Sequence, residues 1–235
     1  SRRRRSRSCG SSNPSRQYGE AKTPPDLAII TYTVRGEGTT SDHAVLSMTE
    51  QGAGIEAALR KIDAPVEPLT GDVKVTPVRS DDCKESDDGS PQLSTGPCAI
   101  LGYVATQSVT VLTSAVRHAG TMVGLIGRGG AFEAHISSFD LRDSHPAQQR
   151  AIQNALSDAA TKATAIAAAS HVPLGSILSL NTAPRQEGEE IEVTAANRSY
   201  APPALAVAPP PVPVNVKPEP ITTSANVTVT YAIGQ

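Results

Sequence analysis

The sequence is poor in aromatic residues and in large apolar side chains. Aromatics make up 3% of the 235 residues, tryptophan is absent, and the apolar share is only 38%. Burial stabilises by about 25 cal/mol per Å² of apolar surface, so a core of alanine and valine gains little per residue. We therefore expect long elements that share one core, or help from oligomerisation. The length suits one large domain or two small interleaved ones.

Long apolar runs and catalytic motifs are also lacking. No run of about 18 apolar residues is present, so no membrane-spanning helix is expected. No signal peptide is recognisable, and the start at Ser1 rather than Met suggests a processed form. The sequence contains no GxSxG, P-loop, GxGxxG or HExxH motif. We therefore expect a protein that is not an enzyme and that holds no metal or cofactor.

Positive charge is scarce except at the N-terminus. The formal net charge is −2, but residues 1–16 carry six arginines and no acid, which leaves 15 basic and 23 acidic residues in the rest. A basic arm of this kind binds nucleic acid or an anionic membrane in some proteins. A flexible or non-native leader over residues 1–24 is the interpretation we favour. The acidic remainder has no basic face with interleaved aromatics, so no nucleic-acid partner is expected.

Two of the three cysteines flank a polar, acidic loop over residues 81–97. We predict that Cys83 and Cys98 form a disulfide across this loop. Closing a loop of this length stabilises by about 3 kcal/mol in the chain-entropy model and implies an oxidising compartment. Two unpaired thiols are the alternative, and a metal site is less favoured because no histidine or third cysteine lies nearby in the sequence.

The remaining cysteine, Cys9, begins the segment CGSSNPS. A cysteine followed by small polar residues resembles the start of a mature bacterial lipoprotein. The preceding SRRRRSRS is not a lipobox, so lipidation of Cys9 is expected only if that stretch replaced a native leader. A lipid there would give peripheral membrane association.

Periodicity predicts an α+β fold with antiparallel sheets and packed helices, in the order β-α-β-β-α-β-α-β-β. The expected strands are 27–38, 69–79, 99–113, 134–141, 174–180 and 221–233. The expected helices start at Ser41 or Asp42, at Ser114, and at Asp143 or Ser144, and the first ends near Ile62. A long Pro-rich excursion over residues 186–220 precedes the last strand.

The third helix has the clearest pattern. Pro146 lies in its first turn, and we predict that an alanine-rich face packs against a sheet or another helix. The residues of this expected face are Ile152, Leu156, Ala159, Ala163 and Ile166.

The order of elements and several local motifs resemble the SIMPL-domain family. The motifs are Pro25-Asp26, RGEG at 35–38, ILGYVATQSVTV at 100–111, HISSFDLRD at 135–143, the helix and strand at 151–180, and ANVTVTYAI at 225–233. The resemblance covers a single SIMPL-like domain over residues 25–235. Family members have a full strand before the Pro-Asp pair, where this chain has only RQYGEAKTP, so we expect that strand to be short or absent.

The resemblance implies a secreted or periplasmic protein of the bacterial cell envelope, for which no catalytic residues are established. Some members are lipoproteins and some assemble into rings. We therefore expect a non-catalytic structural or interaction protein that forms a ring-like homo-oligomer, with an envelope protein or lipid as a further partner. The alternative is a periplasmic module that binds a small ligand or lipid in a cleft between sheet and helices.

Several polar groups could form sites, and we interpret each of them as structural. The histidines fall in different expected elements: His43, His118, His135, His145 and His171. The glycines of 124–132 follow a helix and predict its C-terminus. We interpret Asp140, Arg142 and Asp143 as a solvated turn and helix cap, and the acidic loop as solvated rather than calcium-binding. A hydrolase using His135 and Asp140 is the third hypothesis.

Overall fold

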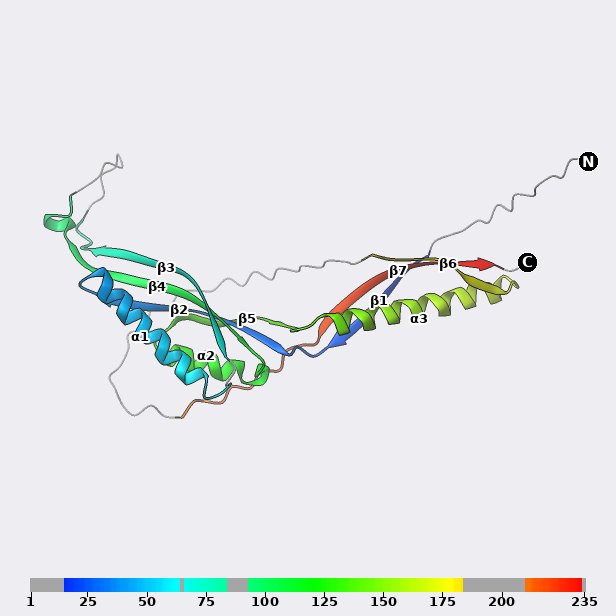
Figure 1. The fold of residues 1–235 in the computed structure, drawn as a ribbon, viewed down its shortest axis with the longest axis horizontal. Helices are drawn as coiled ribbons and strands as arrows, with labels where there is room; N and C mark the ends of the chain where they lie inside the picture. Colours follow the sequence, from blue (N-terminus) through cyan, green and yellow to red (C-terminus); the bar gives the residue numbers. More distant parts are fainter. Residues whose placement is uncertain (1–14, 64–65, 84–92, 184–209, 234–235) are drawn as a thin grey trace, which may run out of the picture. The chain divides into compact units, whose positions relative to one another are not determined.

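The computed structural model describes residues 15–63, 66–83, 93–183 and 210–233. Within these ranges the chain forms three α-helices and seven strands in two antiparallel sheets, which confirms the α+β class (Figure 1). The element order agrees with the predicted order except for one additional strand at the front. The elements group into two compact units that are interleaved in the sequence.

Unit 1 contains a three-stranded sheet, sheet A, and one long helix. Its elements are β1 (Ser15–Thr23), α3 (His145–Ala169), β6 (Leu174–Ala183) and β7 (Ile221–Ile233). The strand order is β1-β7-β6, and both pairings are antiparallel. The last strand of the described chain is therefore the centre of this sheet.

The predicted flexible leader is wrong for residues 15–23, which form β1. This strand pairs with β7 along its whole length, with Gly19 opposite Ala225. Alternate side chains point inward, so Gln17 and Ala21 are buried whereas Glu20 and Lys22 are exposed. The polar composition hid this strand, because an edge strand with one solvated face needs few apolar residues.

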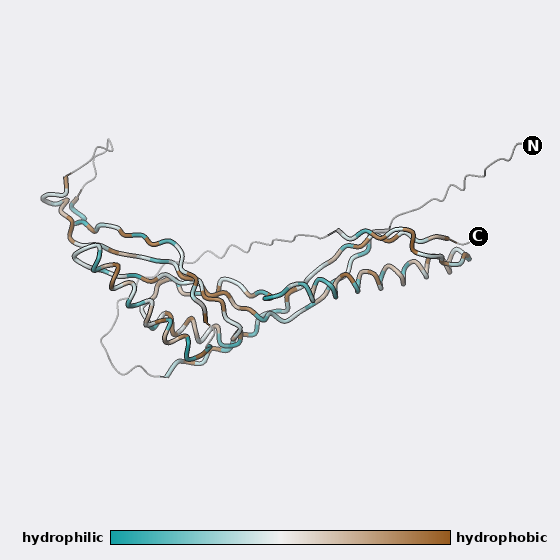
Figure 2. Tube along the Cα trace, viewed as in Figure 1, coloured by the Kyte–Doolittle hydropathy of each residue, from teal (hydrophilic) through white to brown (hydrophobic). Residues whose placement is uncertain are grey.

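Helix α3 starts as predicted, with Ser144 at the N-cap position and a proline in the first turn. Its buried face differs from the predicted one. The buried residues are alanines at a spacing of four or eight: Ala147, Ala151, Ala155, Ala159 and Ala167. Ile152 and Leu156 pack beside this alanine ridge, and Ile166 is 62% exposed. Figure 2 shows hydrophobic and hydrophilic residues alternating along the turns of α3.

The backbone of α3 lies directly on sheet A, which explains the choice of alanine. A β-carbon added at Gly19 of β1 would overlap the backbone of Ala151 and Ala155. At this separation a larger side chain on the facing ridge has no room, because interiors are close-packed. Larger residues such as Ile152 therefore lie to the side of the contact.

Unit 2 contains a four-stranded sheet, sheet B, in the order β3-β4-β2-β5. Its strands are β2 (Leu27–Gly38), β3 (Glu67–Arg79), β4 (Ile100–Thr113) and β5 (Phe132–Asp140). Its helices, α1 (Ser41–Leu59) and α2 (Ala119–Arg128), lie on the same side of the sheet (Figure 1). The predicted hairpin is confirmed, since β3 and β4 pair antiparallel from Glu67↔Leu112 to Arg79↔Ile100.

The core of unit 2 lies between sheet B and its two helices. Strand β2 alternates strictly, so that Ala28, Ile30, Tyr32 and Val34 are buried against the helices. Met48, Ile55 and Leu59 of α1 and Met122 and Ile126 of α2 complete this core. Because β2 is a central strand, its alternation sets the face on which the helices pack.

The predicted helix ends hold for some positions and fail for others. The N-cap of α1 is Thr40, whose hydroxyl accepts the backbone N–H of His43, rather than Ser41 or Asp42. The helix ends at Leu59, three residues before the predicted Ile62. Ser114 does not cap the second helix, because a 3-10 turn, η2 (Val116–His118), precedes α2. The predicted stop at Gly129–Gly130 is confirmed, with Gly129 as the C-cap and Gly130 at φ +82°.

Among the described helices, none is long and apolar enough to cross a membrane.

Candidate interaction surfaces

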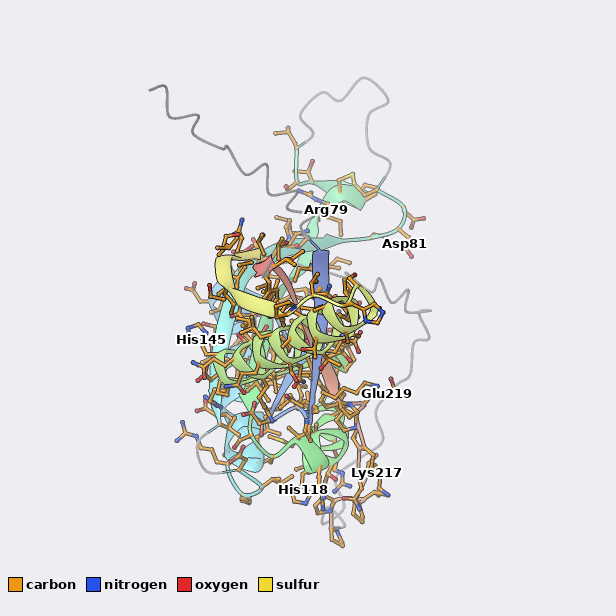
Figure 3. The ribbon with its side chains drawn as sticks, turned by 90° about the vertical axis from the view of Figure 1, so that its right-hand side faces the viewer. Arg79, Asp81, His118, His145, Lys217 and Glu219 are labelled. Carbon is orange, nitrogen blue, oxygen red and sulfur yellow. A yellow bond between two sulfur atoms is a disulfide. The ribbon has the colours of Figure 1, made fainter. Side chains whose placement is uncertain are left out.

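The hairpin of β3 and β4 carries the disulfide between Cys83 and Cys98, whose Cα atoms are 4.7 Å apart. The Arg79 guanidinium donates hydrogen bonds to the Cys98 carbonyl and to Ser94 Oγ, the latter at 3.0 Å. Figure 3 shows Arg79 and exposed Asp81 at this end of unit 2. The covalent bond and the arginine together hold the two strands at the point where the acidic loop leaves the hairpin.

Two of the predicted site regions cannot be placed. Cys9, the residue considered for lipidation, lies outside the described residues, and so do positions 84–92 of the acidic loop. In the described part of the acidic loop, the side chains of Asp81 and Asp82 are both exposed. Within the described ranges, no group of three histidine, cysteine, aspartate or glutamate residues is arranged to hold a metal ion.

The residues of the hydrolase hypothesis make local backbone contacts instead of a shared site. His135 is exposed on edge strand β5, and its Nδ1 lies 2.7 Å from the carbonyl of Glu133. Asp140 Oδ1 accepts the N–H of Leu141 at 2.7 Å. Asp143 Oδ1 accepts the N–H of His145 at 2.9 Å, which satisfies a free donor at the start of α3. The contacts of Asp140 and Asp143 are those of a turn and a helix cap.

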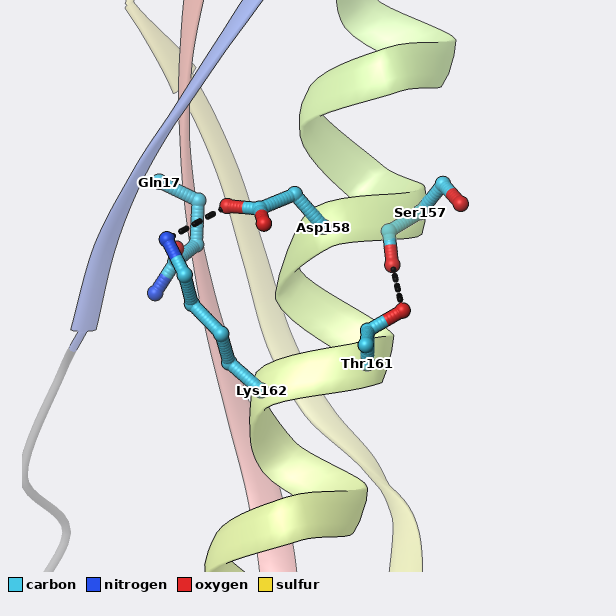
Figure 4. Close-up of polar contacts among 5 residues, drawn as sticks. All are labelled: Gln17, Ser157, Asp158, Thr161 and Lys162. Atoms are coloured by element: carbon cyan, nitrogen blue, oxygen red, sulfur yellow. Dashed lines mark hydrogen bonds and ion pairs between the residues drawn. The ribbon is translucent and has the colours of Figure 1, made fainter.

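A polar cluster lies between α3 and β1 in unit 1 (Figure 4). Gln17 is only 5% exposed, and its side-chain oxygen accepts a hydrogen bond from Lys162 Nζ at 2.8 Å. Lys162 also pairs with Asp158 at 2.6 Å, one helical turn earlier. Since a buried amide costs free energy unless it is hydrogen-bonded, Lys162 satisfies Gln17 and the cluster is structural.

Residues 210–219 form an extended strap over the start of α2. Val214 N–H donates to Thr121 Oγ1 at 2.8 Å, and Val216 N–H donates to the Arg117 carbonyl at 3.1 Å. Gly120 lies under the strap, where an added β-carbon would come within 2.9 Å of the Val214 carbonyl oxygen. Figure 3 shows Lys217 of the strap near His118 of η2. Thus the described end of the Pro-rich excursion is docked, while residues 186–209 lie outside the described ranges.

Unit 1 exposes an apolar surface that the sequence analysis missed. We call it the β6 surface, and it consists of Leu174, Ile177, Leu178 and Leu180 of β6 with Ile233 of β7. The exposed fractions of these side chains run from 36% for Leu174 to 65% for Leu178. Helix α3 packs along β1 and β7 and makes few contacts with β6. The sequence did contain a sign of this surface. A strand with one covered face needs large apolar residues only at alternate positions, but LGSILSL has them at both odd and even positions.

Unit 2 exposes a second apolar surface on its hairpin. Val73 and Val75 of edge strand β3 are 53% and 39% exposed, and Leu101 of β4 is 64% exposed. Large contiguous apolar patches are uncommon on monomeric proteins and are typical of surfaces that bind a partner. Each surface includes an edge strand, β6 or β3, and so combines apolar side chains with a backbone edge that is unpaired within the described part of its sheet.

Comparison with family models matches residues 17–231, from β1 to β7, to the model described as SIMPL, protein of unknown function (DUF541). No curated protein matches the chain.

Proposed function

Because the chain belongs to the SIMPL family, whose function is unknown, we propose that it is a non-catalytic structural or interaction protein of the bacterial cell envelope. In this proposal the chain assembles with copies of itself into a ring-like homo-oligomer. The observation that carries the proposal is the pair of exposed apolar surfaces on the edge strands β6 and β3.

The gain from burying these side chains on association supports assembly. Side chains such as Leu178 and Val73 are more than half exposed in the single chain. Covering them removes apolar area from water, and the buried centre of a protein–protein interface is where such residues concentrate. The core of unit 1 consists mainly of alanine and valine and supplies little burial per residue, so contacts between copies would add the stabilisation that the composition predicts.

The compartment is proposed from the Cys83–Cys98 disulfide. Such bonds persist in oxidising environments and are rare in the cytosol. We place the protein in the periplasm or on an envelope membrane, where a lipid on Cys9 would anchor it. The partner of the assembled form is then an envelope protein or a lipid surface.

The test is the mass of the full chain in solution, measured by light scattering after size exclusion, with and without reductant. A Cys9→Ser variant serves as the control for cross-linking through the third cysteine. We expect a discrete multimer that survives both reductant and the Cys9→Ser change. A monomer at micromolar concentration would contradict self-assembly and favour the ligand-binding alternative. A multimer that reductant dissolves, and that Cys9→Ser abolishes, would attribute association to a cross-link rather than to apolar surfaces.

A further inference from the structure

The two sheets have four edge strands: β1 and β6 in sheet A, and β3 and β5 in sheet B. An edge strand presents unpaired N–H and C=O groups, and proteins protect such edges with charge or proline. Three of the four edges are protected in this way. Their charged and proline residues are Glu20 and Lys22 in β1, Pro68, Asp72, Lys74 and Pro77 in β3, and Glu133 and Asp140 in β5.

Strand β6 differs from the other three edges. Its sequence, LGSILSLNTA, contains neither a charged residue nor a proline. Every residue from Leu174 to Thr182 is exposed. The pairing with β7 is irregular up to Ser179 and regular from Ser179 to Ala183. The regular half therefore presents an unprotected edge for a further strand, with the large apolar residues beside it.

We propose that β6 of one copy pairs antiparallel with β6 of a second copy, which joins two A sheets across a two-fold axis. This inference rests on the proposed self-assembly and names one contact of it, since a two-fold contact joins two copies and a ring needs a second interface between such dimers. The backbone edge specifies a β-strand as the occupant, because only another strand satisfies a row of N–H and C=O groups.

The composition of β6 identifies the occupant as a second copy. Antiparallel pairing about a two-fold axis is isologous, so one patch serves both partners. Like charges directly opposite each other destabilise a sheet, and an uncharged strand meets its own copy without that repulsion. Ile177 and Leu180 lie opposite Tyr231 and Val229 of β7, which places them on the face of sheet A that carries α3, beside the area that the helix covers. Pairing brings these residues against the same residues of the second copy and covers them.

The first test compares two lysine substitutions in the full chain carrying Cys9→Ser. Leu180→Lys changes a residue of β6 that is 52% exposed, and Val73→Lys changes a residue of β3 that is 53% exposed. Both sites are half exposed on edge strands, so both variants are expected to fold with unchanged far-ultraviolet circular dichroism. We expect Leu180→Lys to weaken the pairing of two copies at least about tenfold in Kd, and Val73→Lys, which lies outside the β6 contact, to leave that pairing unchanged.

The second test introduces no charge, so its result does not depend on whether a lysine variant folds. Ser179→Cys and Asn181→Cys, each in the Cys9→Ser background, place a thiol on the regular half of β6, with Lys22→Cys on β1 as the control. We expect mild oxidant to cross-link at least one β6 variant into a dimer and to leave the β1 variant monomeric on a denaturing gel.

The outcomes separate this inference from the proposed function. A multimer that resists Leu180→Lys and shows no β6 cross-link would overturn the β6 contact while self-assembly stands. A multimer dissolved by Val73→Lys instead would move the contact to the hairpin. A parent chain that is monomeric at every concentration would overturn both.

Discussion

At the scale of single residues, two glycines determine how closely helices approach sheets. Gly19 of β1 lies under Ala151 and Ala155 of α3, and Gly36 of β2 lies under Ala44 and Met48 of α1. In both units the glycine of the strand contacts the helix backbone at two residues that are four positions apart in the helix. The sequence predicted both helices but not these contacts, because a glycine in a strand has several explanations until its neighbour is known.

Replacing Gly36 with alanine tests this contact. The added methyl group would overlap helix backbone, which has no room to move as a side chain would, so we expect Gly36→Ala to lower the free energy of unfolding by about 1–3 kcal/mol. The matched control is Gly52→Ala in α1, where nothing lies within 4 Å, and that change should raise stability by about 0.5–1 kcal/mol. Urea unfolding of both variants measures the difference, and equal midpoints would contradict the close approach.

Tyr32 provides a prediction for alkaline pH. Its side chain is 2% exposed, and burial raises its pKa from 10.0 to about 12, with the charge of Glu56 adding to the shift. The folded state therefore binds the phenolic proton more tightly than the unfolded state does. Stability from this group is present below pH 10 and is lost as the pH rises toward 12. We expect the unfolding midpoint of the parent chain to fall more steeply between pH 10 and 12 than that of Tyr32→Phe.

At the scale of elements, the sequence predicted those whose pattern is set by local burial. Alternation of apolar residues predicts the range of β7 and the β3–β4 hairpin. The placement of glycine predicts the end of α2 at Gly129. Strand β1 was not predicted, and the alanine-rich face of α3 was predicted with only Ala159 of its buried residues, because each depends on a partner distant in the sequence. The docking of the strap on α2 was missed for the same reason, since it depends on the Thr121 hydroxyl and the bare backbone of Gly120.

The strap can be loosened without changing its own sequence. Gly120→Ala would place a methyl group within 2.9 Å of the Val214 carbonyl oxygen, so the strap must move away from α2. We expect the amide protons of Val214 and Val216 to exchange roughly tenfold faster, which corresponds to about 1.4 kcal/mol of easier local opening. Gly124→Ala in the same helix has nothing within 4 Å and serves as the control. Unchanged protection in Gly120→Ala would contradict the docking.

At the scale of the whole molecule, the chain builds two units from interleaved segments. The length allowed either one domain or two interleaved ones, and the expected single domain over residues 25–235 instead contributes to both units. The pairing of β1 with β7 could not be read from the sequence, because register between such distant segments leaves no local pattern. The two apolar surfaces became evident only when the helices were seen to leave β6 and β3 partly uncovered.

Removing the central strand of sheet A tests the division into units. A chain that ends at Glu219 lacks β7, so β1 and β6 lose their partner and α3 loses much of its packing surface. We expect amide protection to disappear in β1, α3 and β6 and to remain in β2, β4 and the helices of unit 2. Hydrogen exchange with mass spectrometry measures this, and a chain lacking residues 1–14 is the control. Loss of protection throughout would show that the units do not fold independently.

The pairing of Gly19 with Ala225 also has a consequence for the order of events during synthesis. At about 5–20 residues per second, roughly 10–40 seconds separate the emergence of β1 from that of its partner strand. Through that interval α3 has no completed sheet to cover, whereas the strands of unit 2 have all emerged by Asp140. Strand β1 must therefore wait for β7, and it stays without its partner for longer than any other described strand.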